Sequence, residues 1–328
     1  WDYSGKRFNL NGYVCLQYSL LWGVLGLLVL AAAVVAGSYL YVRAYLKSDG
    51  FLAMLEQSAV DDMNVETARI DPLDWDGSGI RCGGVTMEGH EFLTSLQARN
   101  IETEFSRWEL LKRAFVITSV NIAELKLRLA PVPFRFREKP EGARSWAEEN
   151  ILPDTFRLEK GSIDSLSVSY GEVGQLYVLD GTRVESAYDA GSSQYRFEMQ
   201  GGRLLLPFKG CPEFSLMSGT AQFNHASRRV NVPSCRLTTA AGGYLDIKGD
   251  WDGSSSSWTA NMVVNGVPAS SVLEDHWKKH VQGSVSGGID LRGGRDGVTH
   301  VAGLARLQGG MLTGLPVLDR LALFCGSS

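Results

Sequence analysis

The stretch ELKLRL, Glu124 to Leu129, decides the fold class, because its residues alternate strictly between charged and apolar side chains. Successive side chains of a β-strand point to opposite faces of a sheet. Leu125, Leu127 and Leu129 therefore share one face, and the three charged residues share the other. Such an alternation is typical of an antiparallel strand with one face on a core and one face in water. The stretch predicts a half-buried strand.

The same two-residue period recurs through the rest of the chain. The further runs are Leu166, Val168 and Tyr170; Tyr195, Phe197 and Met199; Leu245 and Ile247; Trp258, Ala260, Met262 and Val264; and Val285, Ile289 and Leu291. Four dipeptides that favour tight reversals accompany these runs: Asp180-Gly181, Asp252-Gly253, Asn265-Gly266 and Asp296-Gly297. The sequence therefore predicts a mainly β fold with many turns.

Composition and charge exclude several classes of protein. The chain of 328 residues has 37 glycines and a hydrophobic content of 44%, which fits a folded domain and argues against disorder. The net charge is −4, and the basic residues are spread along the chain, so nucleic acid is not an expected partner.

Among five cysteines there is no CxxC. Cys211 and Cys235 could be bridged in an oxidising compartment or remain free and buried.

Short helical candidates and one linker interrupt the strand pattern. Phe51, Leu52 and Leu55 are at helical spacing after Ser48 or Asp49, either of which can cap a short amphipathic helix. Further helical candidates are 106–113, 269–280 and 315–324, and a linker rich in proline and charge occupies 131–153. We expect a membrane anchor at 1–48 and a first β-rich subdomain with short helices at 49–130. After the linker, a second β-rich subdomain at 154–328 ends in a short helix.

The N-terminal region carries a membrane signal. The stretch from Phe8 to Val42 has no charged residue. Its most apolar part, from Leu20, can cross a hydrocarbon layer of roughly 30 Å as one helix. It is longer than the apolar core of a signal peptide, which has about 7–15 residues. Two basic residues on each side leave the orientation open. The expected anchor positions are Leu20, Trp22, Leu25, Leu28, Leu30, Val34, Val35, Leu40 and Tyr41.

The sequence contains no catalytic signature. There is no GxSxG and no P-loop. His276 and His280 lie four residues apart in EDHWKKH, but the glutamate of HExxH is missing, so a solvated helix face is favoured over zinc. Asp71, Asp74 and Asp76 of DPLDWDGSG could suggest calcium, but the distal glutamate of an EF-hand is missing, so a turn before a strand is favoured. We expect a protein that is not an enzyme and that holds no cofactor and no metal.

Three segments together resemble a known family. They are LLVLAAAVVAGSYLYVRAYLKSDGFLAMLEQ, FSRWELLKRAFVITSVNIAELKLRL and VAGLARLQGGMLTGLPVLDRLALF. The region from Leu27 to Phe324 resembles the AsmA-like proteins of bacterial envelopes, and the closing strand, GG turn and LTGLPVLDRL are its most specific part. The resemblance implies an inner-membrane helix and a periplasmic part. It also implies a long, curved antiparallel sheet that forms an apolar groove for phospholipids.

The opening 26 residues, WDYSGKRFNLNGYVCLQYSLLWGVLG, resemble a membrane segment of ABC-transporter-type integral membrane proteins instead. A match to so small a part of a multi-pass protein does not extend a transport function to the rest. The chain begins with Trp1 and stops directly after an apolar segment, so we expect a piece of a longer protein or a fusion.

The expected function is therefore phospholipid transfer or outer-envelope biogenesis by a single-pass protein of the bacterial inner membrane with its C-terminal domain in the periplasm. Its expected partners are the membrane, a phospholipid or other lipid, and other envelope proteins. Two alternatives remain open: a structural or assembly scaffold of an envelope complex, and a fragment of an ABC-transporter-type membrane protein. The candidate lipid-facing positions are Leu125, Leu127, Leu129, Tyr195, Phe197, Leu245, Ile247, Trp258 and Met262.

Overall fold

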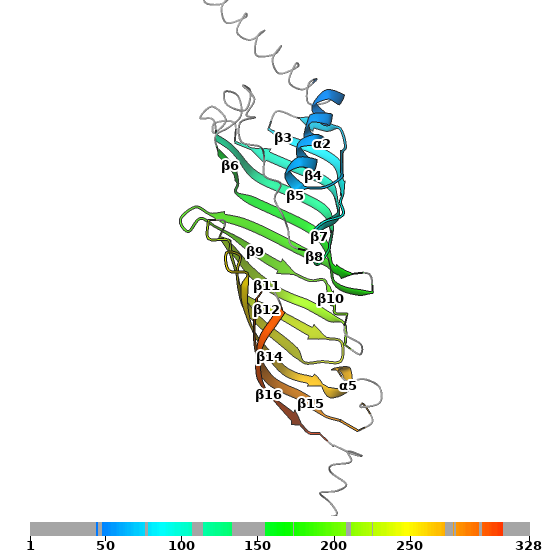
Figure 1. Ribbon diagram of the computed structural model, residues 1–328, viewed down its shortest axis with the longest axis vertical. Coiled ribbons are helices and arrows are strands. Elements are labelled where there is room, and N and C mark those ends of the chain that lie inside the picture. Colours follow the sequence, from blue (N-terminus) through cyan, green and yellow to red (C-terminus); the bar gives the residue numbers. More distant parts are fainter. Residues whose placement is uncertain are drawn as a thin grey trace, which may run out of the picture.

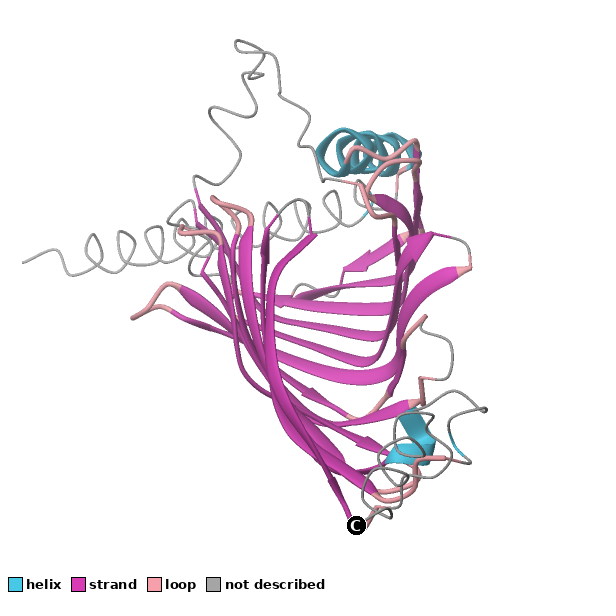
Figure 2. Ribbon diagram, turned by 60° about the horizontal axis from the view of Figure 1, so that its bottom comes forward, coloured by secondary structure: helices cyan, strands magenta, loops and turns pink. Residues whose placement is uncertain are grey.

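The described part of the chain forms one large β-sheet. The computed structural model describes residues 44, 48–75, 78–106, 114–132, 155–172, 174–207, 211–224, 226–272, 278, 280–294 and 297–310. Sixteen strands within these ranges belong to a single sheet, and they are stacked along the long axis of the molecule (Figure 1). Figure 2 shows the strands bending strongly along their length. The prediction of a mainly β fold is confirmed.

The elements have the following bounds. The strands are β1 (Thr67–Ile70), β2 (Leu73–Trp75), β3 (Gly79–Glu88), β4 (Leu93–Phe105), β5 (Ala114–Leu129), β6 (Thr155–Leu158), β7 (Lys160–Glu172), β8 (Gln175–Asp189), β9 (Gln194–Gln200), β10 (Arg203–Leu205), β11 (Phe214–Asn224), β12 (Arg229–Thr239), β13 (Tyr244–Asp252), β14 (Ser257–Pro268), β15 (Ser284–Gly294) and β16 (Gly297–Gln308). The helices are α2 (Asp49–Met63) and α5 (Ala269–Val272). All the predicted alternating runs lie in strands.

The order of strands follows the chain. The path through the sheet is β1-β3-β4-β5-β7-β8-β10-β11-β12-β13-β14-β15-β16. The other three strands lie alongside this path: β2 pairs with β3, β6 pairs with β5, and β9 pairs with β8 and β11. Strands in a sheet lie about 4.8 Å apart, so the path extends over roughly 60 Å.

One junction corrects the prediction of a wholly antiparallel sheet. β5 pairs in parallel with both β6 and β7, whereas every other pair of described strands is antiparallel. A parallel pair needs a connection long enough to return the chain to the other end of the sheet. The predicted linker at 131–153 falls between these strands, so the long connection and the change of direction coincide. The subdomain boundary proposed there stays a prediction.

Helix α2 begins as predicted and covers the first edge of the sheet. Ser48 is its N-cap, and the Ser48 hydroxyl accepts a hydrogen bond from the Phe51 backbone N–H at 3.3 Å. A side-chain acceptor at this position satisfies an N–H that has no partner inside the helix. From the same helix, the Glu56 carboxylate accepts the backbone N–H of Ile70 in β1 at 2.9 Å. An open strand edge is thus occupied by a helix side chain.

Strand register gathers the apolar side chains on one face of the sheet, which we call the apolar face. One row crosses nine strands: Ala68, Met87, Leu96, Leu127, Val168, Leu179, Leu204, Phe214 and Thr239. Two further rows continue it, through Leu216, Leu237, Leu245 and Val264, and through Cys235, Ile247, Met262 and Ile289. The opposite face, the polar face, is lined by charged residues, amides and hydroxyls.

Bulges keep the apolar face continuous where strands bend. Positions on the apolar face in β8, β11 and β14 are three residues apart instead of two at Leu179 to Thr182, Leu216 to Gly219 and Val264 to Val267, and the pairing register shifts at or beside each point. Gly181 and Gly266, with φ of 70° and 62°, supply the left-handed backbone that two of these bulges need.

Two of the four predicted turns are therefore wrong. Asp180-Gly181 lies inside β8 and Asn265-Gly266 lies inside β14, because a bulge glycine and a turn glycine adopt the same backbone conformation. Asp252-Gly253 does begin the connection between β13 and β14. Asp296 lies outside the described residues.

Candidate functional site

The apolar face brings together the nine candidate lipid-facing positions. Leu127 lies in the long row, next to its strand neighbours Leu125 and Leu129, and Ile247 and Met262 are direct partners on β13 and β14. Tyr195 and Phe197 of β9 pair with Phe223 and Ala221 of β11 and join the same face. Eight of the nine are partly exposed. Leu245, at 8% exposure, belongs to the core.

One end of the apolar face is closed by packing. Phe214, Leu216, Leu237, Leu245 and Val267 form a buried cluster on β11 to β14, and their exposures lie between 1% and 8%. Leu206 and Cys211, from the connection between β10 and β11, pack against this cluster, as do Ile247 and Met262. Side chains packed in this way give the sheet a local hydrophobic core. A ligand could not reach these buried residues without displacing their neighbours.

The other end of the apolar face carries a row of aromatic residues. Tyr188, Tyr195, Phe223, Trp251 and Trp258 occupy one register row across β8, β9, β11, β13 and β14, with Val230 of β12 between them. The ring centroids of Tyr188 and Tyr195 are 4.9 Å apart. The side chain of Trp251 is 43% exposed. The apolar face therefore has a buried core at one end and a partly exposed row of aromatic residues, the aromatic rim, at the other.

Only part of this rim was predicted from the sequence. Tyr195 and Trp258 were among the candidate positions, whereas Tyr188, Phe223 and Trp251 were not. For Trp251 a signal was present, because Leu245, Ile247, Gly249 and Trp251 keep the two-residue period. For Phe223 no local signal existed, since its face depends on the bulge near Met217.

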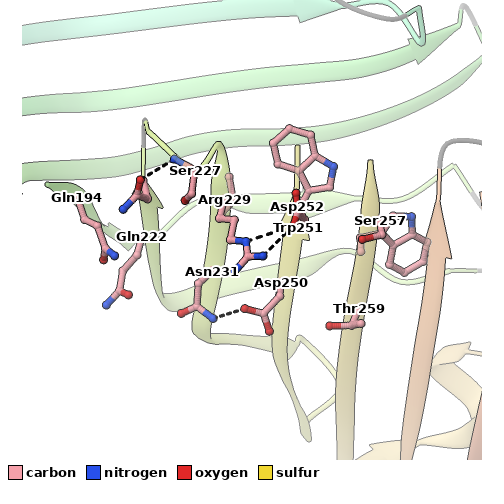
Figure 3. Close-up of a pocket in the computed structure, with 13 residues that line it drawn as sticks. Gln194, Gln222, Ser227, Arg229, Asn231, Asp250, Trp251, Asp252, Ser257 and Thr259 are labelled. Atoms are coloured by element: carbon pink, nitrogen blue, oxygen red, sulfur yellow. Dashed lines mark hydrogen bonds and ion pairs between the residues drawn. The ribbon is translucent and has the colours of Figure 1, made fainter. Parts of the chain in front are cut away.

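A polar hollow of about 510 Å³ lies at the same end of the strands (Figure 3). Two register rows of the polar face line it: Gln222, Asn231, Asp250 and Thr259 in one row, and Gln194, Asn224, Arg229, Asp252 and Ser257 in the other. Ser227, Val230, Trp251 and Trp258 complete the lining. Asp250 and Trp251 are consecutive, so their side chains leave β13 on opposite faces.

Two of the three charges in the hollow neutralise each other. Arg229 Nη2 lies 3.1 Å from Asp252 Oδ2. Asp252 also accepts hydrogen bonds from the hydroxyl and backbone N–H of Ser254 and from the backbone N–H of Ser255. These hydrogen bonds, led by that from the Ser254 hydroxyl, lower the pKa of Asp252 to about 2. Asn231 Nδ2 donates to Asp250 Oδ1 at 2.6 Å, as the dashed line in Figure 3 shows.

A second polar hollow, of about 380 Å³, lies on the polar face between β5 and β9. Ser162 Oγ donates to Asn121 Oδ1 there at 2.7 Å, and Arg196 pairs with Glu198 at 3.2 Å. Lys160 and Glu185 also line it. Charged residues form a larger share of this lining than of the first hollow.

The candidate metal and disulfide residues that the structure describes do not form a site. Cys82, Cys211 and Cys235 are free thiols, and burial raises the pKa of each. Asp71 and Asp74 lie at the break between β1 and β2 and within β2, so the expected turn there includes a short strand. Within the described ranges no group of three metal-ligating side chains exists. Asp76 and His276 lie outside the described residues.

Comparison with known proteins finds one match. A family model described as "Putative ABC-transporter type IV" matches residues 1–54. The predicted resemblance of the opening segment is thereby confirmed, and the match extends into α2. No curated protein and no solved structure matches the chain. The match covers a small part of the chain, so the family of the sheet is not established by it.

The predicted membrane anchor falls outside the part that the structure describes. All nine anchor positions, from Leu20 to Tyr41, lie outside the described residues. Within the residues that are described, no helix combines the length and apolar character needed to span a bilayer.

Proposed function

We propose that this chain is an AsmA-like protein of the bacterial envelope. In this proposal an N-terminal helix anchors it in the inner membrane, and its sheet lies in the periplasm. There the apolar face binds acyl chains in phospholipid transfer or outer-envelope biogenesis. The observation that carries the proposal is the row from Ala68 to Thr239, which is apolar at every position except its last, continued by two rows to β15. The role is binding without turnover.

Burial energetics support an acyl ligand. The apolar face exposes parts of Leu127 on β5, Phe197 on β9 and Ile247 on β13. Each methylene that leaves water contributes about 0.8 kcal/mol, so an acyl chain lying across several strands gains several times that amount. A row of apolar residues perpendicular to the strands offers similar contacts on each strand, which suits a ligand that moves along the sheet.

The polar face supports the same assignment by contrast. Arg99 pairs with Glu124, and Arg236 pairs with Asp246 at 2.7 Å and lies 4.7 Å from the Tyr244 ring centroid. Exposed pairs of this kind suit a solvated surface and contribute little to stability. The two faces therefore differ sharply in chemistry, as a lipid-binding sheet in an aqueous compartment requires.

Photo-crosslinking of the full chain tests the proposal. A photoreactive amino acid at Ile247 should label phospholipid in membranes, whereas the same group at the neighbouring Lys248 should not, because consecutive residues face opposite sides. Leu127 and Lys126 form a second matched pair. Equal labelling within both pairs, or no lipid adducts at Ile247 and Leu127, would overturn the assignment.

Two other functions each have one observation in their favour. The buried cluster around Leu237 resembles a filled core more than an open surface, which favours a structural or assembly scaffold of an envelope complex. The match of residues 1–54 favours a component of an ABC-transporter-type membrane protein. A scaffold would yield no lipid adducts in the crosslinking experiment. A transporter component would copurify with a nucleotide-hydrolysing subunit.

A further inference from the structure

We propose that the polar hollow at the ends of β11 to β14 binds a saccharide. The hollow lies on the polar face, opposite the apolar face, so the inference is independent of the lipid proposal and goes beyond it. Its volume of about 510 Å³ lies within the range of ordinary ligand pockets, about 300–1,000 Å³.

The side chains of the hollow differ from those of the rest of the polar face. Ion pairs occupy the surroundings, such as Arg236 with Asp246 and Arg203 with Asp180. The hollow instead gathers four primary amides and several hydroxyls in its two register rows. The amides are Gln194, Gln222, Asn224 and Asn231. An amide offers a donor and an acceptor in one group, and a sugar hydroxyl needs both.

The charge of the hollow excludes an anionic ligand. Arg229 is its only cation, and Asp252 neutralises it at 3.1 Å. Asp252 is in turn saturated by Ser254, Ser255 and Arg229. The remaining charge is the Asp250 carboxylate, so the lining carries a net charge of −1. A phosphate or carboxylate ligand would be repelled, whereas hydroxyl groups can donate to Asp250.

Several polar groups of the hollow are available to a ligand. The side chains of Gln194, Gln222 and Thr259, and the Oδ2 atom of Asp250, have no hydrogen-bond partner among the described residues. Gln222, Asp250 and Thr259 belong to one register row, and Asn231 lies between the first two. They therefore present donors and acceptors in a line across four strands, spaced by the strand separation of about 4.8 Å.

Two tryptophan residues contribute to the lining of the hollow where the strands end. Trp251 and Trp258 are part of its lining, and Trp251 is 43% exposed. In Figure 3 the Trp251 side chain points away from Asn231 and Asp250, toward the ends of the strands. Asp250 and Trp251 are consecutive, so the Trp251 indole leaves β13 on the side of the sheet opposite the amides. The hydroxyls of a saccharide would therefore contact the amides, Thr259 and Asp250, and the two tryptophans serve as nearby spectroscopic reporters.

Binding of two trisaccharides to the full chain tests this inference. Maltotriose and chitotriose are titrated against protein held in a polyoxyethylene detergent, because alkyl maltosides would compete. Binding is followed by saturation-transfer NMR and by tryptophan fluorescence, since Trp251 and Trp258 belong to the strands that line the hollow. We expect at least one trisaccharide to bind. Asn231→Ala and Gln222→Leu should each weaken it by about tenfold, the loss of one hydrogen bond to a charged or polar group.

Matched controls separate this outcome from a general loss of structure. Asn121→Ala removes an amide that is also hydrogen-bonded on the polar face but lies in the second hollow, and it should leave binding unchanged. Gln222→Leu breaks no hydrogen bond between described residues. It therefore still measures the loss of saccharide affinity if Asn231→Ala fails to fold. The inference fails if neither trisaccharide binds, if inorganic phosphate competes, or if Asn121→Ala weakens binding as much as Asn231→Ala. Lipid crosslinking at Ile247 should be unaffected by all three variants.

Discussion

Thr182 should be a rare position where removing a hydroxyl stabilises the protein. Its side chain on β8 is fully buried at 0% exposure, and Oγ1 has no hydrogen-bond partner among the described residues. Burying an unpaired hydroxyl costs about 1–3 kcal/mol. Valine has the same shape with a methyl group in place of the hydroxyl. Thr182→Val should therefore raise the free energy of unfolding by about 1–2 kcal/mol.

Thr239 is the matched control for this experiment. It lies on β12 at 7% exposure, but its hydroxyl donates to the carbonyl of Gly242. Thr239→Val should lower the free energy of unfolding by about 1 kcal/mol, because the hydrogen bond is lost. Urea unfolding of the full chain in one detergent, followed by tryptophan fluorescence, measures both changes. The reasoning is refuted if Thr182→Val unfolds at or below the wild-type midpoint, or if both variants shift it in the same direction.

Three further predictions follow from packing, backbone conformation and titration. Leu237→Ala should cost about 2.7–5 kcal/mol in urea unfolding because Leu237 is 3% exposed in the buried cluster, whereas Arg236→Ala on the opposite face should cost below about 1 kcal/mol. Gly266→Ala should cost about 1–2 kcal/mol because its φ is 62°, with open space around the added methyl, whereas Gly288→Ala on β15, in ordinary strand conformation, should be nearly neutral. The lowered pKa of Asp252 means that its stabilising contribution is complete above pH 4 and disappears as the pH falls toward 2, so Asp252→Asn should flatten the acid limb of the unfolding midpoint plotted against pH. A cost near zero for Leu237→Ala, equal costs for the two glycine variants, or an unchanged acid limb would contradict the corresponding prediction.

The local period predicted the strands, because a strand with one buried face must alternate. Leu125 to Leu129, Tyr195 to Met199 and Trp258 to Val264 all lie in strands as expected. The cap of α2 was also predictable, since Ser48 acts through a contact three residues away. These features depend on neighbours in sequence, where propensity and spacing are informative.

The two-residue period could not predict how strands far apart in the sequence pair with one another. The parallel pairing of β5 with β7 depends on how a long connection returns, and nothing in either strand encodes it. Bulges were hidden for a related reason. Asp180-Gly181 and Asn265-Gly266 meet the requirements of both a turn and a bulge, and only pairing with neighbouring strands decides between them. The hollow was not predicted because its lining comes from five strands, and their register decides which polar residues meet.

The apolar face and the polar hollow both depend on the same strand register. Asp250 faces the polar hollow and Trp251 belongs to the aromatic rim, and they are consecutive residues of β13. A slip of one residue in the pairing of β13 would therefore place the carboxylate on the apolar face and the indole in the hollow, and it would do the same to Asn231 and Val230 if β12 followed. Such a slip is opposed by the bulge between Val232 and Cys235, which fits one register only, and by the buried cluster around Leu237 and Leu245. The closed end of the apolar face thus fixes the register on which both the open rim and the hollow depend.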